Sequence, residues 1–155
     1  MTDHSGFTFF EILIVVAIIA IASSIAVPSV ISWRQNAKMK GAVNNIYGDM
    51  QYAKFTAIKE NNWVAIQFFP NRYEIFFDDG DQIKEAGERM IKNVDMPAGI
   101  TIDSTTFASN RTGFDRRGLP DIDTLNVGTR TGKVSLLGPS AISRSITLNR
   151  LGRLN

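Results

Sequence analysis

An almost unbroken apolar stretch runs from Ile12 to Val27 near the start of this 155-residue chain, and a single acid, Glu11, lies directly before it. Between Phe7 and Ile31, a stretch of 25 residues, Glu11 is the only ionisable side chain. As a helix these residues would span roughly 37 Å, and the hydrocarbon core of a bilayer is about 30 Å thick. Each large aliphatic residue favours insertion by roughly 0.3 to 0.6 kcal/mol, whereas one charged residue at the centre opposes it by about 2.5 to 3.5 kcal/mol. The sequence therefore predicts a membrane-spanning helix that tolerates one carboxylate.

Two simpler interpretations of this stretch stay open. A cleavable secretory signal has basic residues, then a shorter apolar region, then small residues at a cut site. No Lys or Arg precedes the apolar run, although Ala22-Ser23-Ser24 would serve as a cut site. A plain membrane anchor explains the hydrophobicity, but it explains neither Glu11 nor the Gly6-Phe7 junction.

The residues from Gly6 to Ala20 resemble the class III signal of type IV pilins and type II secretion pseudopilins. In that family a prepilin peptidase cuts after the glycine, and the new N-terminal phenylalanine is N-methylated. The resemblance therefore implies a leader at residues 1–6, cleavage between Gly6 and Phe7, and methylation of Phe7. Pro28 falls where these proteins usually have a helix-bending proline. The implied partners are other pilin or pseudopilin subunits in a hetero-oligomeric filament, the prepilin peptidase, the inner-membrane assembly platform and membrane lipid.

This resemblance gives the lone acid a role in assembly. In a filament the apolar helices, residues 7–32, would pack against one another without water. The carboxylate of Glu11 could then meet the α-amino group of Phe7 on a neighbouring subunit. Two opposite charges that pair in such a site offset part of each other's desolvation cost, and the pair sets axial register more than it adds stability.

The leader departs from the family pattern because it has no Lys or Arg, whereas leaders in the family are usually basic. By charge alone, Arg34, Lys38 and Lys40 beyond the span would place the C-terminal domain in the cytoplasm. The motif implies the opposite orientation, with one span in the bacterial inner membrane and the C-terminal domain in the periplasm. We follow the motif, because the peptidase reads the Gly-Phe junction.

From Trp33 the pattern becomes amphipathic, which predicts the second half of the same helix over residues 33–61. The whole helix is expected from about Thr8 to Glu60, kinked near Pro28, with Asn61-Asn62 as its stop because Asn tolerates a left-handed cap. Core packing explains the apolar positions better than a cofactor site does. These positions are Met39, Val43, Ile46, Tyr47, Met50, Ala53, Ala57 and Ile58.

Residues 62–155 lose the helical period and predict a globular β domain. Short strands separated by Gly, Pro and Asn favour an α+β, pilin-like fold, with two antiparallel sheets packed on the amphipathic helix. Residues 104–123 and 138–143 are expected to be irregular. The expected strands are Trp63–Phe69, Arg72–Phe77, Met90–Val94, Gly99–Asp103, Leu125–Val127, Lys133–Leu137 and Ser145–Asn149.

Two segments indicate which group of the pilin and pseudopilin family the chain resembles most. Phe114–Pro120 and the terminal Ile146–Asn155 resemble the GspH/FimT group of minor pseudopilins and minor pilins. The C-terminal disulfide of many major pilins cannot form, because the chain has no cysteine. The resemblance implies a structural, non-enzymatic subunit of a type II secretion pseudopilus that supports protein export. The alternative is a minor pilin of a type IV pilus, in which DNA uptake is a further role.

The residues offer no catalytic constellation. The only histidine, His4, lies in the expected leader, and the absence of cysteine excludes thiol catalysis and thiolate metal sites. Asp78-Asp79-Gly80-Asp81 crowds carboxylates into one loop, but it lacks the alternate spacing and distal Glu of a calcium loop. A turn is therefore expected there, and neither a metal nor a cofactor is expected in the chain.

The C-terminal region carries most of the positive charge, although the whole chain has a formal net charge of only +2. Proteins similar to FimT use a C-terminal Gly-Arg-x-Arg tail in DNA capture, which makes Arg144, Arg150 and Arg153 the candidate DNA contacts. The matching tail, Gly152–Asn155, lacks the second arginine. A solvated basic face or a subunit interface is therefore the favoured interpretation, and binding through phosphates would be salt-dependent.

Overall fold

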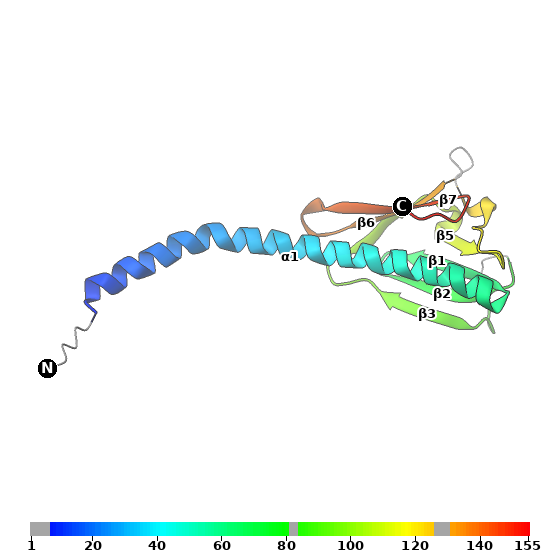
Figure 1. Cartoon of the computed structure of the whole chain (residues 1–155), viewed down its shortest axis with the longest axis horizontal. Coiled ribbons are helices and arrows are strands. Elements are labelled where there is room, and N and C mark those ends of the chain that lie inside the picture. Colours follow the sequence, from blue (N-terminus) through cyan, green and yellow to red (C-terminus); the bar gives the residue numbers. More distant parts are fainter. Residues whose placement is uncertain (1–6, 81–83, 126–130) are drawn as a thin grey trace. The chain divides into compact units, whose positions relative to one another are not determined.

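The computed structural model describes residues 7–80, 84–125 and 131–155, and the chain divides into two compact units, Met1–Ala37 and Lys38–Asn155. Helix α1, Phe9–Glu60, belongs to both units (Figure 1). It begins one residue after the expected start, because Thr8 caps it. Its end is as expected: Asn61 has a φ of 49°, its N–H donates to the Ile58 carbonyl, and the N–H of Asn62 donates to the Ala57 carbonyl. This is the Schellman pattern that closes helices.

The N-terminal unit consists of the first half of α1, and none of its described residues is buried. Its large apolar side chains are all exposed, from Phe7 to Trp33. By length and composition alone, α1 could cross a membrane. The helix continues through Pro28 without interruption. Because proline has no N–H, the Ser24 carbonyl lacks its usual helical donor, and the kink at this site stays a prediction.

In the second unit α1 buries one stripe of side chains at spacings of three and four, namely Met39, Ala42, Ile46, Met50, Ala53 and Ala57. Two residues of the expected stripe, Tyr47 and Ile58, are exposed instead, and Val43 is only partly buried. The reason is geometric: each follows a stripe residue by one position, which turns it about 100° away from the sheets. The apolar character of Tyr47 and Ile58 therefore needs another explanation than core packing, whereas Val43 packs against the core.

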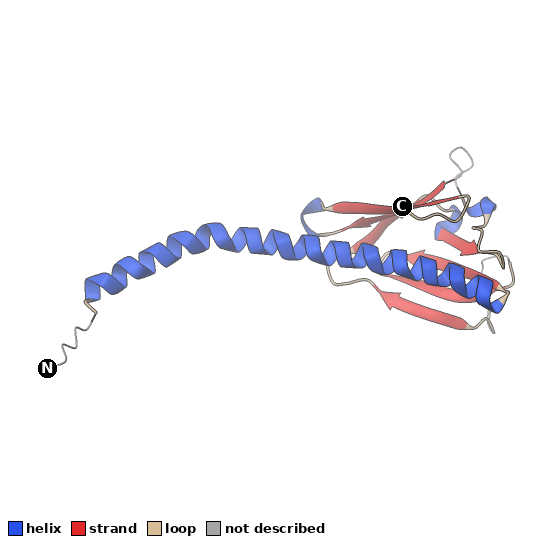
Figure 2. Ribbon diagram, viewed as in Figure 1, coloured by secondary structure: helices blue, strands red, loops and turns tan. Residues whose placement is uncertain are grey.

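Two antiparallel sheets complete the second unit, which confirms the predicted α+β, pilin-like architecture (Figure 2). The first sheet has the order β3-β2-β1-β5, and the second has the order β4-β6-β7. Residues of α1 and of both sheets form one apolar core. The strands are β1 Trp63–Phe69, β2 Arg72–Asp78, β3 Met90–Asp95, β4 Thr101–Thr105, β5 Arg111–Phe114, β6 Thr131–Leu137 and β7 Ser143–Asn149.

Three sequence-based expectations for the sheets were wrong in part. Strand β5 lies inside residues 104–123, which were expected to be irregular. Strand β4 begins two residues later than expected and ends at Thr105. No strand begins at Leu125, which is buried in a bend after the 3-10 turn Ile122–Thr124, and residues 126 and 127 lie outside the described ranges. Burial of an apolar side chain in a loop and pairing of a short strand both depend on tertiary contacts.

A partly buried polar contact joins α1 to the first sheet. The Tyr73 hydroxyl donates to Asp49 Oδ2 at 2.6 Å, and Lys92 Nζ donates to both oxygens of the same carboxylate at 2.6 and 2.8 Å. Burial, and then the Asp49 carboxylate, raise the pKa of the Tyr73 hydroxyl, so it stays a neutral donor. The contact fixes the helix against β2 and β3.

We expect Asp49→Ala to lower the free energy of unfolding by about 2 to 3 kcal/mol, because it leaves the buried Tyr73 hydroxyl without its acceptor. Chemical denaturation of the full-length protein in detergent measures this. Tyr73→Phe should cost less, and the double variant should cost little more than Asp49→Ala alone. Strictly additive losses would contradict the coupling.

Candidate functional site

The first turn of α1 holds its acid by a reciprocal cap. Thr8 donates its N–H and its hydroxyl to Glu11 Oε2, at 2.8 and 2.9 Å, and the Glu11 N–H donates to Thr8 Oγ1 at 3.2 Å. This is the capping box, in which two otherwise unsatisfied donors of a helix start are used. The role of Thr8 was not predicted, although the Thr-x-x-Glu spacing that signals a capping box is present in the sequence.

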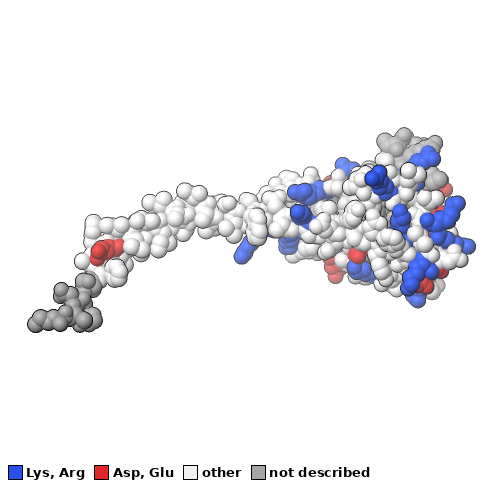
Figure 3. Space-filling model, in the orientation of Figure 1, with Lys and Arg blue, Asp and Glu red and all other residues white. Residues whose placement is uncertain are grey.

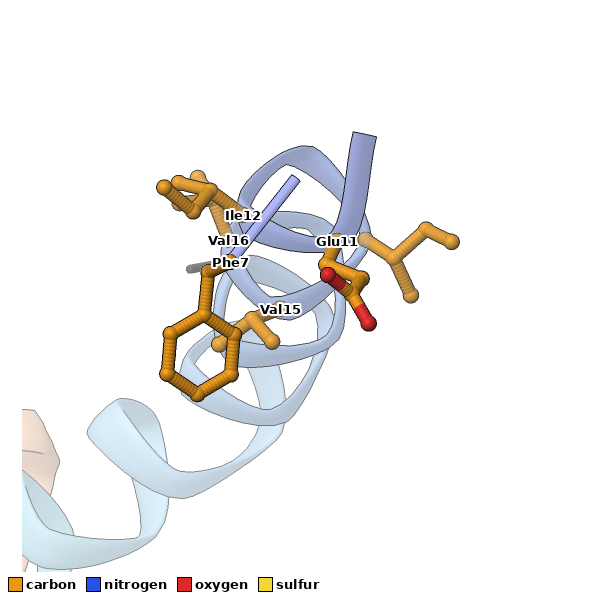
Figure 4. A pocket seen from close by; sticks show the side chains of 6 residues that line it. Phe7, Glu11, Ile12, Val15 and Val16 are labelled. Atoms are coloured by element: carbon orange, nitrogen blue, oxygen red, sulfur yellow. The ribbon is translucent and has the colours of Figure 1, made fainter. Parts of the chain in front are cut away.

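Around this turn the chain presents an open apolar groove lined by Phe7, Ile12, Val15 and Val16, with the Glu11 carboxylate beside it (Figure 4). The Phe7 ring is 87% exposed and points to a different side of the helix from the carboxylate (Figure 4). Within the described residues, Glu11 has hydrogen-bond partners but no cationic one. The groove and the carboxylate are thus both available to another molecule. Gly6, the other residue of the expected cleavage site, lies outside the described ranges.

The structure does not bring the three candidate DNA contacts together. Arg144 pairs with Leu136 near the start of β7, whereas Arg150 follows the end of that strand. Six residues of extended strand separate the two arginines by about 20 Å. Arg153 lies near Arg150, because the tail turns back after Asn149, whose side-chain oxygen accepts the N–H groups of Leu151 and Arg153.

The tail then extends the second sheet. Thr147 and Asn155 exchange two backbone hydrogen bonds of 2.9 Å, and Leu154 forms a bridge to Leu148. Leu154 is buried in the core. The end of the chain therefore covers the outer edge of β7 and holds Arg153 in a fixed position.

The segment Phe114–Pro120, which carried the narrower resemblance, is a tight structural loop. Asp115 Oδ1 accepts the N–H groups of Arg117 and Leu119, and Asp115 Oδ2 lies 3.0 Å from the Arg117 guanidinium. Gly118 has a φ of 75°, which favours glycine. Burial raises the pKa of the Asp115 carboxyl, but the bonds from Leu119 and Arg117 outweigh burial and hold it below its ordinary value. The carboxylate therefore organises the loop.

The loop and the tail meet on the last turns of α1. Lys54 Nζ donates to the Gly152 carbonyl at 2.9 Å. A Cβ on Gly118 would lie 2.6 Å from Ile58 Cδ1, and a Cβ on Gly152 would lie 2.8 Å from the Gly118 carbonyl oxygen. Both glycines have positive φ, and both allow this close approach. Three segments that are distant in sequence thus form one continuous surface.

The acidic loop contains a group that could hold a cation. The carboxylates of Asp78, Asp79 and Glu88 lie within 4.8 Å of one another. Asp78 Oδ2 accepts the N–H of Gly80, whose φ is 119°, as in a bent connection. Asp81 of the expected turn lies outside the described ranges. Glu88 was not foreseen, because it follows the loop by several residues.

Glu74 on β2 is buried and carries two ion pairs, to Arg72 and Lys84. Burial raises the pKa of its carboxyl, but the bonds from Lys84 and Arg72 together outweigh burial and hold it below the ordinary value of 4.5. The stabilisation is therefore complete above that value and is lost as the pH falls through the lower, folded-state pKa.

We therefore expect the melting temperature of the full-length protein to fall between about pH 5 and pH 3. Glu74→Gln should reduce this dependence, whereas Glu85→Gln, at an exposed acid of the following segment, should leave it unchanged. Melting scans at several pH values measure both. An unchanged acid dependence in Glu74→Gln would refute the assignment.

Comparisons with known proteins agree with this geometry. The pattern of the family described as Type II transport protein GspH matches residues 42–152, and the prokaryotic N-terminal methylation motif matches residues 1–27. No curated protein matches the chain in sequence.

Two solved structures are similar in fold. The type IV minor pilin FimU of Pseudomonas aeruginosa PAO1 is 14% identical, with a TM-score of 0.57 over 79% of this chain and 90% of FimU. The minor pseudopilin EpsH of the type 2 secretion system of Vibrio cholerae is 12% identical, with a TM-score of 0.55 over 76% of this chain and 94% of EpsH.

An apolar N-terminal helix half, followed by an amphipathic half packed on two antiparallel sheets, defines a pilin-like protein. The GspH family model matches residues 42–152, which is most of the chain, so it identifies one family within the pilin-like proteins. The chain belongs to the GspH family of type II transport proteins.

Proposed function

We propose that the chain is a structural minor pseudopilin of a type II secretion pseudopilus, which assembles through its N-terminal helix and supports protein export. The observation that carries the proposal is an exposed apolar helix half with a capped carboxylate at its start, in a chain that matches the GspH family. Removal of residues 1–6 by prepilin peptidase would leave Phe7 as the methylated N-terminus. Residues 7–32 would form the membrane and filament-core helix, 33–61 its amphipathic half, and 62–155 the globular domain.

Assembly would exchange one apolar environment for another. In the bacterial inner membrane, lipid would cover the exposed side chains of residues 7–32, with the globular domain in the periplasm. In the filament, helices of other pilin-like subunits would replace the lipid. The Glu11 carboxylate, held by Thr8 in the isolated chain, would then pair with the α-amino group of Phe7 on a neighbour. Pro28 would let the helix bend to fit this packing.

The test is genetic and direct. In a strain that lacks this subunit, a protein exported by type II secretion should accumulate in the periplasm, and the wild-type chain should restore its export. The chain should also appear in sheared filaments. Normal export in the deletion strain, together with loss of pilus-dependent motility, would favour a pilus instead.

That second candidate, a minor pilin of a type IV pilus, has support of its own, because FimU is as similar in fold as EpsH is. A DNA-binding role would rest on Arg150 and Arg153, with Arg144 as a separate contact about 20 Å away. Such binding should weaken as salt increases, and Arg150→Ala with Arg153→Ala should reduce the salt dependence by about two counterions. Gel-shift titrations of the full-length protein measure it.

A further inference from the structure

Exposed apolar side chains gather where the loop and the tail meet the end of α1. Phe55 and Ile58 lie one turn apart on the outer side of the helix, and Leu119 and Leu151 adjoin the two glycines that contact it. Phe55 is 63% exposed and Leu151 is 67% exposed. These four residues and the three arginines Arg116, Arg150 and Arg153 are called the helix-end surface. A cluster of large exposed apolar residues with a polar rim is typical of an interaction site.

The charge of this surface indicates what kind of partner fits it. The three segments that form this surface contain six Lys or Arg residues but only two acidic residues. These segments are Tyr52–Glu60, Asp115–Pro120 and Asn149–Asn155. Both acids are paired locally, Glu60 with Lys59 and Asp115 with Arg117. Within the described ranges, no carboxylate pairs with Arg116, Arg150 or Arg153. Figure 3 shows Lys and Arg side chains gathered at the end of the domain where α1 ends.

The surface is also rigid before any partner arrives. Asp115 fixes the loop with two backbone bonds and one ion pair, and Lys54 ties the tail to the helix. The tail is further held as an added strand on β7. A surface that is already ordered loses little conformational entropy on binding.

We infer that the helix-end surface docks a different protein subunit, through an acidic segment that also carries apolar side chains; this rests on the proposed function. The arginine rim disfavours a second copy of this chain, because like charges would face each other. Three of the four apolar residues, Ile58, Leu119 and Leu151, are aliphatic, so Phe55 is the one apolar member of this surface with a ring on which a nucleic-acid base could stack. Exposed aromatic and aliphatic side chains in combination with arginines are typical of protein interfaces, in which aromatic residues and arginine are enriched.

A photo-crosslinking experiment on the full-length chain in membranes tests this. Benzoylphenylalanine replaces Leu119 in cells that contain the other pilin-like subunits and the prepilin peptidase. Leu137 provides the matched control, because it is also 38% exposed but lies at the far end of β6. We expect the probe at position 119, and not at 137, to crosslink one other pilin-like subunit, at a peptide that contains Asp or Glu.

Charge reversal makes the test specific. Arg150→Glu and Arg153→Glu should each lower the crosslink yield by about tenfold, because they place acid against acid. Arg144→Glu, at an exposed arginine near the start of β7 and about 20 Å from Arg150, should leave the yield unchanged. Reversing the acid next to the crosslinked site of the partner should restore the yield with Arg150→Glu.

Crosslinks to a second copy, to lipid or to DNA would overturn the inference. The absence of any crosslink would also overturn it, and so would a crosslink yield that charge reversal does not change. The same cells are assayed for loss of residues 1–6 and for the chain in sheared filaments. If both occur without the expected crosslink, the inference alone fails. If the chain is neither processed nor incorporated, the proposed function fails. The crosslink can still be measured in the membranes, where its presence or absence tests the inference separately.

Discussion

Glu11→Leu should leave membrane insertion intact and lower incorporation into filaments by about a hundredfold or more. The variant is more apolar, so it should insert at least as well as the wild type. In the filament it would leave the α-amino group of a neighbouring Phe7 buried without its partner. Loss of one member of a buried ion pair costs about 3 to 5 kcal/mol, and each 1.4 kcal/mol is about tenfold. Quantitative immunoblots of sheared filaments and of membranes measure the two quantities.

Two controls separate the ion pair from the cap. Thr8→Ala removes the hydroxyl that donates to Glu11 Oε2 and accepts from the Glu11 N–H, but it keeps the backbone N–H of residue 8 and the carboxylate. Its cost should be about 1 kcal/mol of helix stability, and incorporation should fall by less than about tenfold. Val15→Leu changes the same groove without changing charge and should be neutral. Wild-type incorporation of Glu11→Leu would contradict the pairing.

Phe114→Ala should be among the most destabilising single core truncations in the first sheet. The ring is 0% exposed, and the residue pairs with Val64 on β1 and bridges to Pro120. Truncation of a buried phenylalanine costs about 3 to 5 kcal/mol, because it removes apolar contacts and leaves a cavity. The melting temperature of the full-length protein in detergent should fall by on the order of 10 °C or more.

The chain offers a matched control for this change. Phe55→Ala removes the same atoms from a side chain that is 63% exposed, so it should alter the free energy of unfolding by no more than about 0.5 kcal/mol. Similar losses for Phe114→Ala and Phe55→Ala would mean that the burial pattern of the domain is wrong. Phe55→Ala should instead weaken docking at the helix-end surface.

The helix and most strands could be predicted because their patterns are long and regular. Continuous apolar residues after Glu11 and a three-four spacing from Met39 leave few other interpretations. Strand β5 could not be predicted in this way, since Arg111-Thr112-Gly113-Phe114 is short and contains a glycine. Its pairing with β1 makes it a strand, and that contact joins residues more than 40 positions apart.

The candidate sites divide in the same way. Gly6-Phe7 and Glu11 stand out in the sequence because their spacing is local. The helix-end surface depends on contacts between distant segments, such as the hydrogen bond from Lys54 to Gly152, which is 98 positions away. The sequence pattern of either segment alone therefore does not predict this surface. The exposure of Ile58 could not be predicted either, because its spacing in the sequence fits the buried stripe of α1. Only the contacts with the sheets determine which side of the helix is buried.

The most direct test of the account is the intact mass of the full-length chain, purified from membranes after co-expression with a prepilin peptidase. We expect a mass that lacks residues 1–6 and carries one additional methyl group on Phe7. The same chain expressed without the peptidase should keep the leader. A chain that keeps residues 1–6 in the presence of an active peptidase would contradict the account and leave a plain membrane anchor.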